Sequence, residues 1–152
     1  MPRPWDKYAT LLRVRERQER LKAQVLGEAR REIRFAEAQR EALAEEQRRV
    51  LEEAGVAAGH TVDARKAQAL IHYERHIARR AVDKDAEIHG LRAVEERKRI
   101  DLEEAMKRRK IVERLTERVR LTYLEHVRKE EQKQFDETAS VQAALERKAA
   151  RT

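Results

Sequence analysis

The stretch Gly55-Val56-Ala57-Ala58-Gly59 is the one small-residue patch in a chain that has no other helix-breaking segment. Both prolines, Pro2 and Pro4, precede residue 5. Glycine favours the left-handed backbone that ends many helices, and Thr61 and Asp63 can cap the amides of a following helix. The sequence therefore predicts a helix over about 5–54, a turn over about 55–63 and a second helix over about 64–147.

The composition excludes a compact globular core. Of the 152 residues, 43% are charged, 40% are apolar and 4% are aromatic, which is typical of extended coiled coils. We therefore expect one elongated all-α domain over residues 1–152. No run of about 18 apolar residues and no secretory signal is present, so we expect a soluble cytoplasmic protein. The absence of cysteine excludes disulfides and thiolate metal sites.

Apolar residues recur every three or four positions in both predicted helices, which indicates a coiled-coil seam in each. In the first helix 10 of 13 seam positions are apolar: Leu11, Val14, Gln18, Leu21, Val25, Ala29, Ile33, Ala36, Arg40, Leu43, Gln47, Val50 and Ala54. In the second helix 11 of 15 are apolar: Leu70, Tyr73, Ile77, Ala81, Lys84, Ile88, Leu91, Glu95, Lys98, Leu102, Ala105, Arg109, Val112, Leu115 and Val119.

An antiparallel hairpin pairs these seams when the numbers of facing residues add to about 123. Four-residue steps through Val25, Ala29 and Ile33 form a stutter, where we expect the supercoil to unwind locally. In this register Gly90 faces Ile33, which fits close packing of the two helices. Alternatively, Gly90 is a tolerated glycine that costs about 1 kcal/mol.

The two predicted helices differ in length, so the second helix overhangs the first. We expect the segment 115–139 to project alone while it carries an apolar stripe of Leu115, Val119, Tyr123, Val127 and Phe135. An uncovered apolar stripe of this kind favours docking into another protein. Oligomerisation of the chain through the same stripe is the alternative.

Positive charge concentrates at the open end of the predicted hairpin. Residues 1–34 hold ten lysines or arginines against five acids, and residues 107–129 hold nine against three. Nucleic acid phosphates or an acidic protein could bind such an end. Many cations follow an acid by four residues, which favours an internally paired surface and a protein partner. The pairs expected on this basis are Glu16–Arg20, Glu95–Arg99, Glu103–Lys107, Glu104–Arg108 and Glu125–Lys129.

The sequence contains no catalytic, cofactor-binding or metal-binding motif. With four glycines it cannot form a phosphate-binding loop. His72 and His76 lie one helical turn apart, but the metalloprotease glutamate and a third ligand in phase are absent. Ser140 has no neighbouring base in a predicted cleft. We therefore expect no enzyme activity and no cofactor.

Several short stretches occur in a fixed order with fixed spacing: Ala9-Thr10-Leu11, Leu26-Gly27-Glu28-Ala29-Arg30-Arg31, Ala36-Glu37 with Leu43, Leu115-Thr116-Glu117-Arg118 and the segment 132–139. Over nearly the whole chain they resemble the flagellar export protein FliJ family. The resemblance implies an antiparallel coiled coil similar to the shaft of the ATP synthase gamma subunit. It also implies a non-catalytic stalk at the cytoplasmic base of the flagellum, peripheral to the cell membrane.

The resemblance further implies partners for the two ends of the hairpin. The open end would enter the ring of the hexameric export ATPase FliI, through Leu11, Arg15, Arg30, Arg31, Leu115, Arg118, Tyr123 and Phe135. A face nearer the turn would bind the export-gate protein FlhA, through Gln39, Leu43, Glu46, Val50, Tyr73, Ile77, Arg80 and Lys84. Export chaperones would be further partners.

Three alternatives to a flagellar stalk remain open from the sequence. The equivalent stalk of a virulence injectisome would have the same shape. A basic coiled-coil protein that binds nucleic acid would have the same charge. A self-assembling scaffold would use the same apolar stripe. For four of the expected gate residues, Leu43, Val50, Tyr73 and Ile77, packing within the seam is as good an explanation as partner contact.

Overall fold

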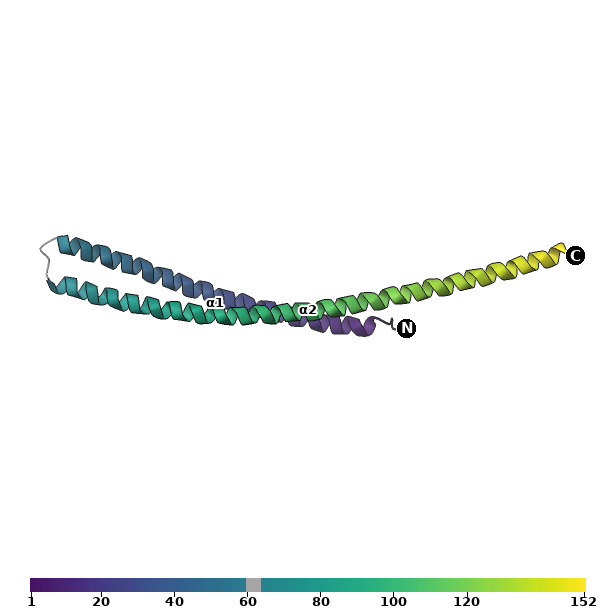
Figure 1. Ribbon diagram of the computed structural model, residues 1–152, viewed down its shortest axis with the longest axis horizontal. Helices are drawn as coiled ribbons and strands as arrows, with labels where there is room; N and C mark the ends of the chain where they lie inside the picture. Colours follow the sequence, from purple (N-terminus) through teal and green to yellow (C-terminus); the bar gives the residue numbers. More distant parts are fainter. Residues whose placement is uncertain (60–63) are drawn as a thin grey trace. The chain divides into compact units, whose positions relative to one another are not determined.

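A computed structural model describes residues 1–59 and 64–152 of the chain (Figure 1). Two helices account for nearly all of them, α1 (Asp6–Gly59) and α2 (Ala64–Ala150). No strand occurs in these two ranges. The helices pack against each other in antiparallel orientation, so the predicted all-α helical hairpin is confirmed.

Helix α1 continues to Gly59, beyond the expected end at residue 54. Residues 55–59, which we expected to begin the turn, are therefore helical. Gly55 has no left-handed backbone dihedral, and the alanines that follow it favour a helix. The predicted caps Thr61 and Asp63 lie outside the described residues.

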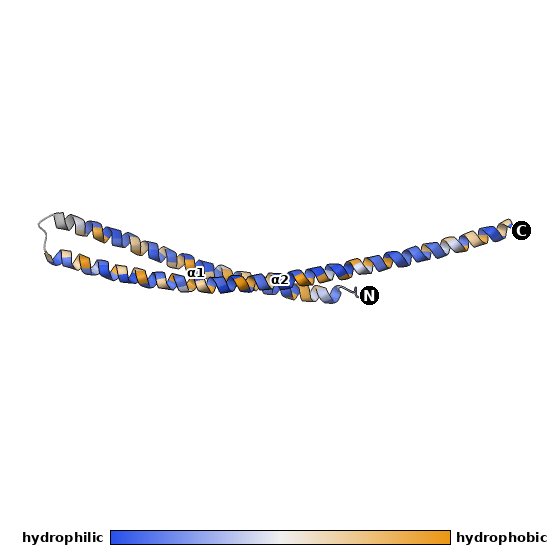
Figure 2. Cartoon of the chain, in the orientation of Figure 1, coloured by the Kyte–Doolittle hydropathy of each residue, from blue (hydrophilic) through white to orange (hydrophobic). Residues whose placement is uncertain are grey.

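Contacts along the chain group into two units. The hairpin unit comprises residues 20–104, and the end unit comprises residues 1–19 and 105–152. Each pairs one part of α1 with one part of α2. Apolar residues are spread along both helices instead of gathering in one core, as the orange segments of Figure 2 show.

The core of the hairpin unit is a single row of buried side chains. They come from α1 (Leu26, Ile33, Ala36, Leu43 and Val50) and from α2 (Ile77, Ala81 and Ile88). Leu43, Val50 and Ile77 form one cluster, against which Leu70 packs. Burial of each large aliphatic side chain stabilises the unit by roughly 1.5–3 kcal/mol. Because the row is one side chain wide, truncation of any side chain in it removes packing that no neighbouring side chain replaces.

The seam of α2 follows the prediction except at Tyr73 and Leu115, which are exposed, whereas that of α1 follows it only from Ala29 onward. Leu11, Val14, Leu21 and Val25, predicted to lie in the seam, are exposed. Leu12 is half-buried and Leu26 is buried in their place. The prediction of the first four turns was therefore wrong by one residue.

This shift also removes the stutter expected near Val25. In residues 20–55 the buried side chains recur at intervals of seven, from Leu26 to Ile33 and from Ala36 through Leu43 to Val50. An unbroken heptad keeps one face toward the partner helix by regular supercoiling. With Leu26 in the seam, α1 has no need to unwind locally.

Gly90 does not mediate close packing. A Cβ atom added to it would meet nothing within 4 Å. The first of our two interpretations of Gly90 was therefore wrong, and the tolerated glycine is correct.

Polar pairs across the hairpin unit report the register of the two helices. Lys84 Nζ donates to Gln39 Oε1 at 2.8 Å, and the two residue numbers add to 123. Arg40 Nε donates to Asp85 Oδ1 at 2.8 Å, and Gln47 Nε2 donates to Glu74 Oε1 at 2.8 Å. These pairs lie close to the predicted register on either side, so that register is confirmed for the hairpin unit.

Contacts between the two helices continue through the end unit. Glu19 contacts Arg109 and Trp5 contacts Tyr123, and both pairs add to 128, within the range of 119 to 129 set by Glu46–Tyr73 and Glu37–Arg92 in the hairpin unit. Side chains of α2 consequently remain partly covered as far as Val127. From Arg128 to Thr152 every side chain is exposed. The projecting segment therefore begins after Val127 and not at Leu115, because α1 reaches further along α2 than the sequence predicted.

Candidate functional site

The first turn of α1 is fixed by hydrogen bonds among its own residues. The Arg3 amide donates to Asp6 Oδ2 at 2.6 Å, and the Trp5 carbonyl accepts from the amides of Tyr8 and Ala9, both at 3.0 Å. A carboxylate that reaches back to an amide ahead of the helix satisfies a donor that would otherwise lack a partner. The chain therefore enters α1 in a defined direction, with Trp5 directed toward α2.

An aromatic contact joins this first turn to α2. The rings of Trp5 and Tyr123 lie edge to face, with centroids 5.4 Å apart and planes at 74°. The Arg3 guanidinium lies over the Trp5 ring at 5.7 Å. Sequence analysis named Tyr123 but missed Trp5. The available signal was that Trp5 is the single tryptophan of the chain and stands directly before the first helix.

An ion pair joins the helices further along the end unit. Arg109 Nε donates to the Glu19 carboxylate, and a second guanidinium nitrogen lies 2.8 Å from Glu113 Oε2. The hydrogen bond to Glu19 raises the pKa of Arg109 above its ordinary value. Its neighbours Lys107, Arg108 and Lys110 are exposed. The basic run of α2 therefore presents three cations outward while the fourth holds α1.

Most of the expected pairs at a spacing of four residues do not form within the described chain. Glu125 and Lys129 do pair, at 3.0 Å. The other four expected pairs are absent from the ion pairs of residues 1–59 and 64–152, so that part of the prediction was wrong. One reason is that Glu95 instead lies 3.3 Å from Arg30 of α1.

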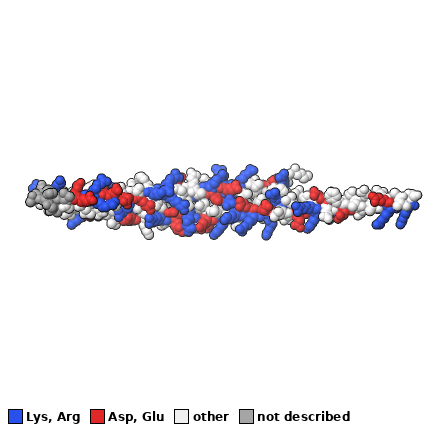
Figure 3. Space-filling model, turned by 90° about the horizontal axis from the view of Figure 1, so that it is seen from above, with Lys and Arg blue, Asp and Glu red and all other residues white. Residues whose placement is uncertain are grey.

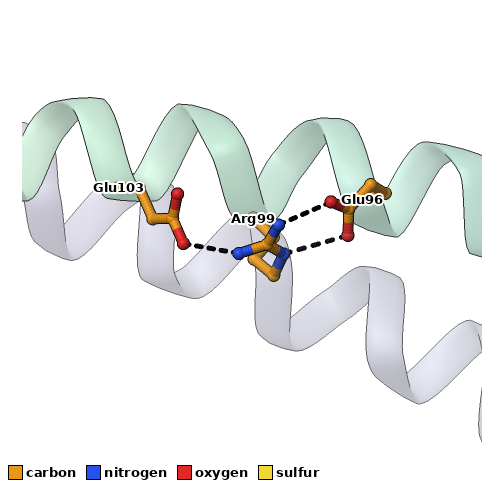
Figure 4. A network of polar contacts seen from close by, with 3 residues as sticks. All are labelled: Glu96, Arg99 and Glu103. Carbon is orange, nitrogen blue, oxygen red and sulfur yellow. Dashed lines mark hydrogen bonds and ion pairs between the residues drawn. The ribbon is translucent and has the colours of Figure 1, made fainter.

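The second reason is a competing network on α2 (Figure 4). Arg99 lies 2.5 Å from Glu96 Oε1 and 2.5 Å from Glu103 Oε1, so Glu103 is unavailable to Lys107. The hydrogen bonds that Arg99 donates to Glu96 lower the pKa of Glu96 and raise the pKa of Arg99. Lys107 and Arg108 are consequently left without the predicted partners. Basic and acidic side chains are nevertheless interspersed along the face seen in Figure 3.

The end unit contains six of the eight residues expected to bind the ATPase. Leu11, Leu115 and Arg118 are exposed near the paired part of the unit, and Phe135 is 76% exposed on the projecting segment. Arg15 donates to Gln18 Oε1 at 3.2 Å, and Tyr123 contacts Trp5. Arg118 also lines a shallow hollow of about 360 Å³ on α2, together with Leu121 and Thr122.

The other two expected ATPase contacts, Arg30 and Arg31, belong to the hairpin unit. Arg30 pairs with Glu95, and Arg31 Nε donates to the Gly27 carbonyl at 3.4 Å. Both guanidinium groups therefore have partners within this chain.

The residues expected to bind the export gate divide into two groups by burial. Leu43, Val50 and Ile77 are buried between the helices, and Ile77 is 0% exposed. Gln39, Glu46, Tyr73, Arg80 and Lys84 lie at the surface or at its edge. The first group therefore supports the face, and only the second group can contact another molecule while the hairpin stays closed.

Two hydrogen bonds across the helices organise the exposed group. One joins Lys84 to Gln39, as described above, and in the other the Tyr73 hydroxyl donates to Glu46 Oε1. The bond to Glu46 raises the pKa of Tyr73 above its ordinary value, with burial and the Glu46 charge acting in the same direction. Tyr73 is still 45% exposed, so its ring faces solvent while its hydroxyl is held.

The described residues contain neither a candidate metal-binding cluster nor a helix that could span a membrane. Residues 1–59 and 64–152 bring together no group of three or more histidine, cysteine or acidic side chains suited to a metal ion, and His72 and His76 are exposed. Neither helix, over these ranges, contains a segment apolar enough to cross a membrane.

Two long helices joined by one narrow seam, with a bare helical segment beyond it, define a coiled-coil protein that works through its surface. Comparison with known families identifies the family to which this coiled-coil protein belongs. Residues 6–148 match the family described as Flagellar FliJ protein, and because this match covers nearly the whole chain, the protein belongs to that family. It is accordingly a flagellar export protein of a non-enzymatic family, associated with the export machinery. No curated protein and no solved structure matched the chain.

Proposed function

We propose that the protein is the central stalk of the flagellar export apparatus. In this proposal it links the hexameric export ATPase FliI to the export gate FlhA, stimulates ATP hydrolysis without catalysing it, and exchanges export chaperones. It acts in the cytoplasm, at the inner face of the membrane below the flagellum. The flagellar family match favours this system over an injectisome.

The observation that carries the proposal is the bare end of α2. From Arg128 to Ala150 the helix has no covering element, yet it presents Phe135, Val141 and Leu145, all largely exposed. Apolar side chains on an isolated helix gain stability when they enter a groove or ring in another protein. The segment of 23 residues would be about 35 Å long, enough to penetrate a protein ring.

Exposed cations lie on the paired part of α2, ahead of this projecting helix. Lys107, Arg108, Lys110 and Arg118 are all exposed on α2, and none of them forms an ion pair within the described chain. Charges that are not neutralised internally are available to attract an acidic partner and to speed the encounter. These cations thus complement the apolar side chains of residues 128–150. The charges guide the partner toward the helix, and burial of the apolar side chains stabilises the complex.

The exposed group near the turn supports the proposed contact with the gate. Tyr73 presents an aromatic ring, Arg80 is exposed, and Gln39 lies on α1 beside Lys84 of α2. Aromatic and arginine side chains are the residues most often responsible for binding energy at protein interfaces. Both helices therefore contribute to one surface that a partner could contact.

The ATPase part of the proposal is tested with Phe135→Ser in the full-length chain. Pull-down and ATP hydrolysis are measured with the cognate export ATPase. We expect weaker binding and less stimulation, because Phe135 is exposed in the free protein and loses only a partner contact. Gln134→Ser, at the exposed neighbouring position, is the matched control. If both variants stimulate hydrolysis like the parent chain, the projecting helix is not the docking element.

The gate part of the proposal is tested with Tyr73→Ala and Ile77→Ala. We expect Tyr73→Ala to weaken FlhA binding with little loss of helix content. Ile77→Ala should reduce helix stability first, since Ile77 is buried in the seam. Parallel losses of binding and stability in both variants would mean that this face only holds the hairpin together.

Binding of a polyanion is a second candidate function. The exposed cations of the 107–110 run favour it. Glu103, the expected partner of Lys107, pairs with Arg99 instead, and Glu104 forms no ion pair with Arg108. A gel shift with a salt titration separates the two functions. A phosphate binder loses affinity steeply as salt rises, whereas docking of an apolar helix does not.

A further inference from the structure

The Trp5 ring is the last side chain at the N-terminal end that reaches α2. Residues 1–4 are all exposed, and α1 itself begins only at Asp6. The backbone around Trp5 is held by the bonds of the first helical turn. The ring, by contrast, is held by its contacts with Tyr123 and the Arg3 guanidinium. The ring can therefore leave Tyr123 without unfolding α1.

Tyr123 lies at the border between the covered and the bare parts of α2. Only Val127, one turn further on the same face, is partly covered beyond it. Tyr123 remains 40% exposed even with Trp5 against it. A partner that encloses the projecting helix and advances toward the paired helices would meet Val127 and then this position. Trp5 occupies the side of Tyr123 that such a partner would need.

The strength of the contact suits a cover that opens. An edge-to-face aromatic pair contributes roughly a 2- to 12-fold preference for the closed arrangement beyond simple burial. The covered form therefore predominates in the free protein, while the uncovered form stays accessible to a competing side chain.

We propose that Trp5 is a removable cover over Tyr123, and that an apolar side chain of the export ATPase replaces it when the protein docks. The replacement of Trp5 by a side chain of the ATPase rests on the proposed function. The cover itself concerns the free protein alone. Competition for Tyr123 makes the N-terminal turn a regulator of docking affinity.

The cover is tested in the free protein by fluorescence, because Trp5 is the only tryptophan in the chain. Tyr123→Ala should make Trp5 emission more accessible to a neutral quencher and shift it toward that of solvent-exposed tryptophan. Leu121→Ala, an exposed apolar position two residues away, is the matched control and should leave the emission unchanged. Equal emission in Tyr123→Ala and the parent chain overturns the cover, whatever the ATPase does.

The exchange step is tested with the cognate ATPase and with fluorotryptophan incorporated into this chain. On docking, the fluorine resonance should move to the position that it has in free Tyr123→Ala. Trp5→Ala should bind the ATPase about 2- to 12-fold more tightly, with unchanged helix content by circular dichroism, and Trp5→Phe should stay close to the parent chain.

Weaker or unchanged binding by Trp5→Ala overturns the exchange step. Weaker binding would make Trp5 part of the docking surface, and unchanged binding would mean that the two contacts do not compete. If the parent chain fails to bind the ATPase, the proposed function and the exchange step fail together. The fluorescence of the free protein then still decides whether Trp5 covers Tyr123.

Discussion

The guanidinium of Arg109 on α2 donates a hydrogen bond to the carboxylate of Glu19 on α1, 90 residues earlier in the chain. Arg109 was predicted as one of the polar positions in the seam of α2, and Glu19 is its partner on α1. Both side chains are about one-fifth exposed, so solvent screens the pair only in part. Together with Trp5 and Tyr123, the pair fixes the register of the end unit.

A charge exchange tests this register. Glu19→Arg or Arg109→Glu alone should lower the thermal midpoint, because each variant places like charges against each other. The double variant Glu19→Arg/Arg109→Glu should recover part of the loss, and the recovery should shrink at high salt. Glu28→Arg combined with Arg109→Glu is the control and should show no recovery. Recovery in the control would indicate a net-charge effect instead of a specific pair.

Burial of Ile77 predicts a large effect of truncation. Ile77→Ala should lower the free energy of unfolding by about 2–4 kcal/mol, because the side chain is fully buried and its row is one residue wide. Ile71→Ala, on the same helix but 48% exposed, should cost about 0.5 kcal/mol or less. Urea titrations followed by circular dichroism measure both. Equal losses would contradict the seam described here.

Gly90→Ala should stabilise the protein by about 1 kcal/mol. A Cβ atom at this position meets no neighbour, so only the gain in helix propensity remains. The reverse change at a nearby exposed position, Ala93→Gly, should destabilise the protein by a similar amount. The same urea titrations apply. A destabilised Gly90→Ala would mean that another helix approaches this surface in solution.

Alkaline pH should weaken the hairpin through Tyr73. The hydrogen bond to Glu46 favours the protonated phenol, so the folded-state pKa lies above the ordinary value of about 10. The contribution is complete below pH 10 and is lost as pH rises through the folded-state pKa, because the unfolded chain releases its proton first. Tyr73→Phe should lack this component when stability is measured from pH 8 to pH 11. Identical pH profiles for both chains would exclude the bond.

Hydrogen exchange should mark where α2 becomes bare. Amides of residues 105–127 pack beside α1, whereas residues 128–150 form a helix without tertiary contacts. Isolated helices of this length are only marginally stable in water, so amides beyond Arg128 should exchange much faster. Mass spectrometry of the free protein measures both segments. Equal protection on both sides of Val127 would mean that the projecting segment is covered in solution, for example by a second copy.

The seam from Ala29 to Val50 could be predicted because α1 offers only one apolar stripe there. Between Leu11 and Leu26 the chain offers two adjacent stripes, one with Leu11, Val14 and Val25 and the other with Leu12 and Leu26. Neighbouring residues on a helix point about 100° apart, so the choice between the stripes rotates the whole face. Periodicity alone cannot make that choice, since both stripes satisfy it.

The candidate site divides in the same way. The exposure of Phe135 could be predicted, because no predicted partner helix reaches it. The role of Trp5 could not, because that role depends on which residue of α2 it meets. Equally, the sequence could not separate buried Ile77 from exposed Tyr73, four residues apart on one predicted stripe.

The sequence by itself determined the two helices, the α1 seam from Ala29 to Val50 and the concentration of cations at the open end, because each depends on local propensity and spacing. Only the tertiary structure decided which side chains of the end unit meet, and with it where α2 loses its partner. Register is settled by the sum of contacts between distant residues, such as Glu19 with Arg109 and Trp5 with Tyr123. No local stretch of sequence contains both partners of these contacts, so local patterns cannot predict them.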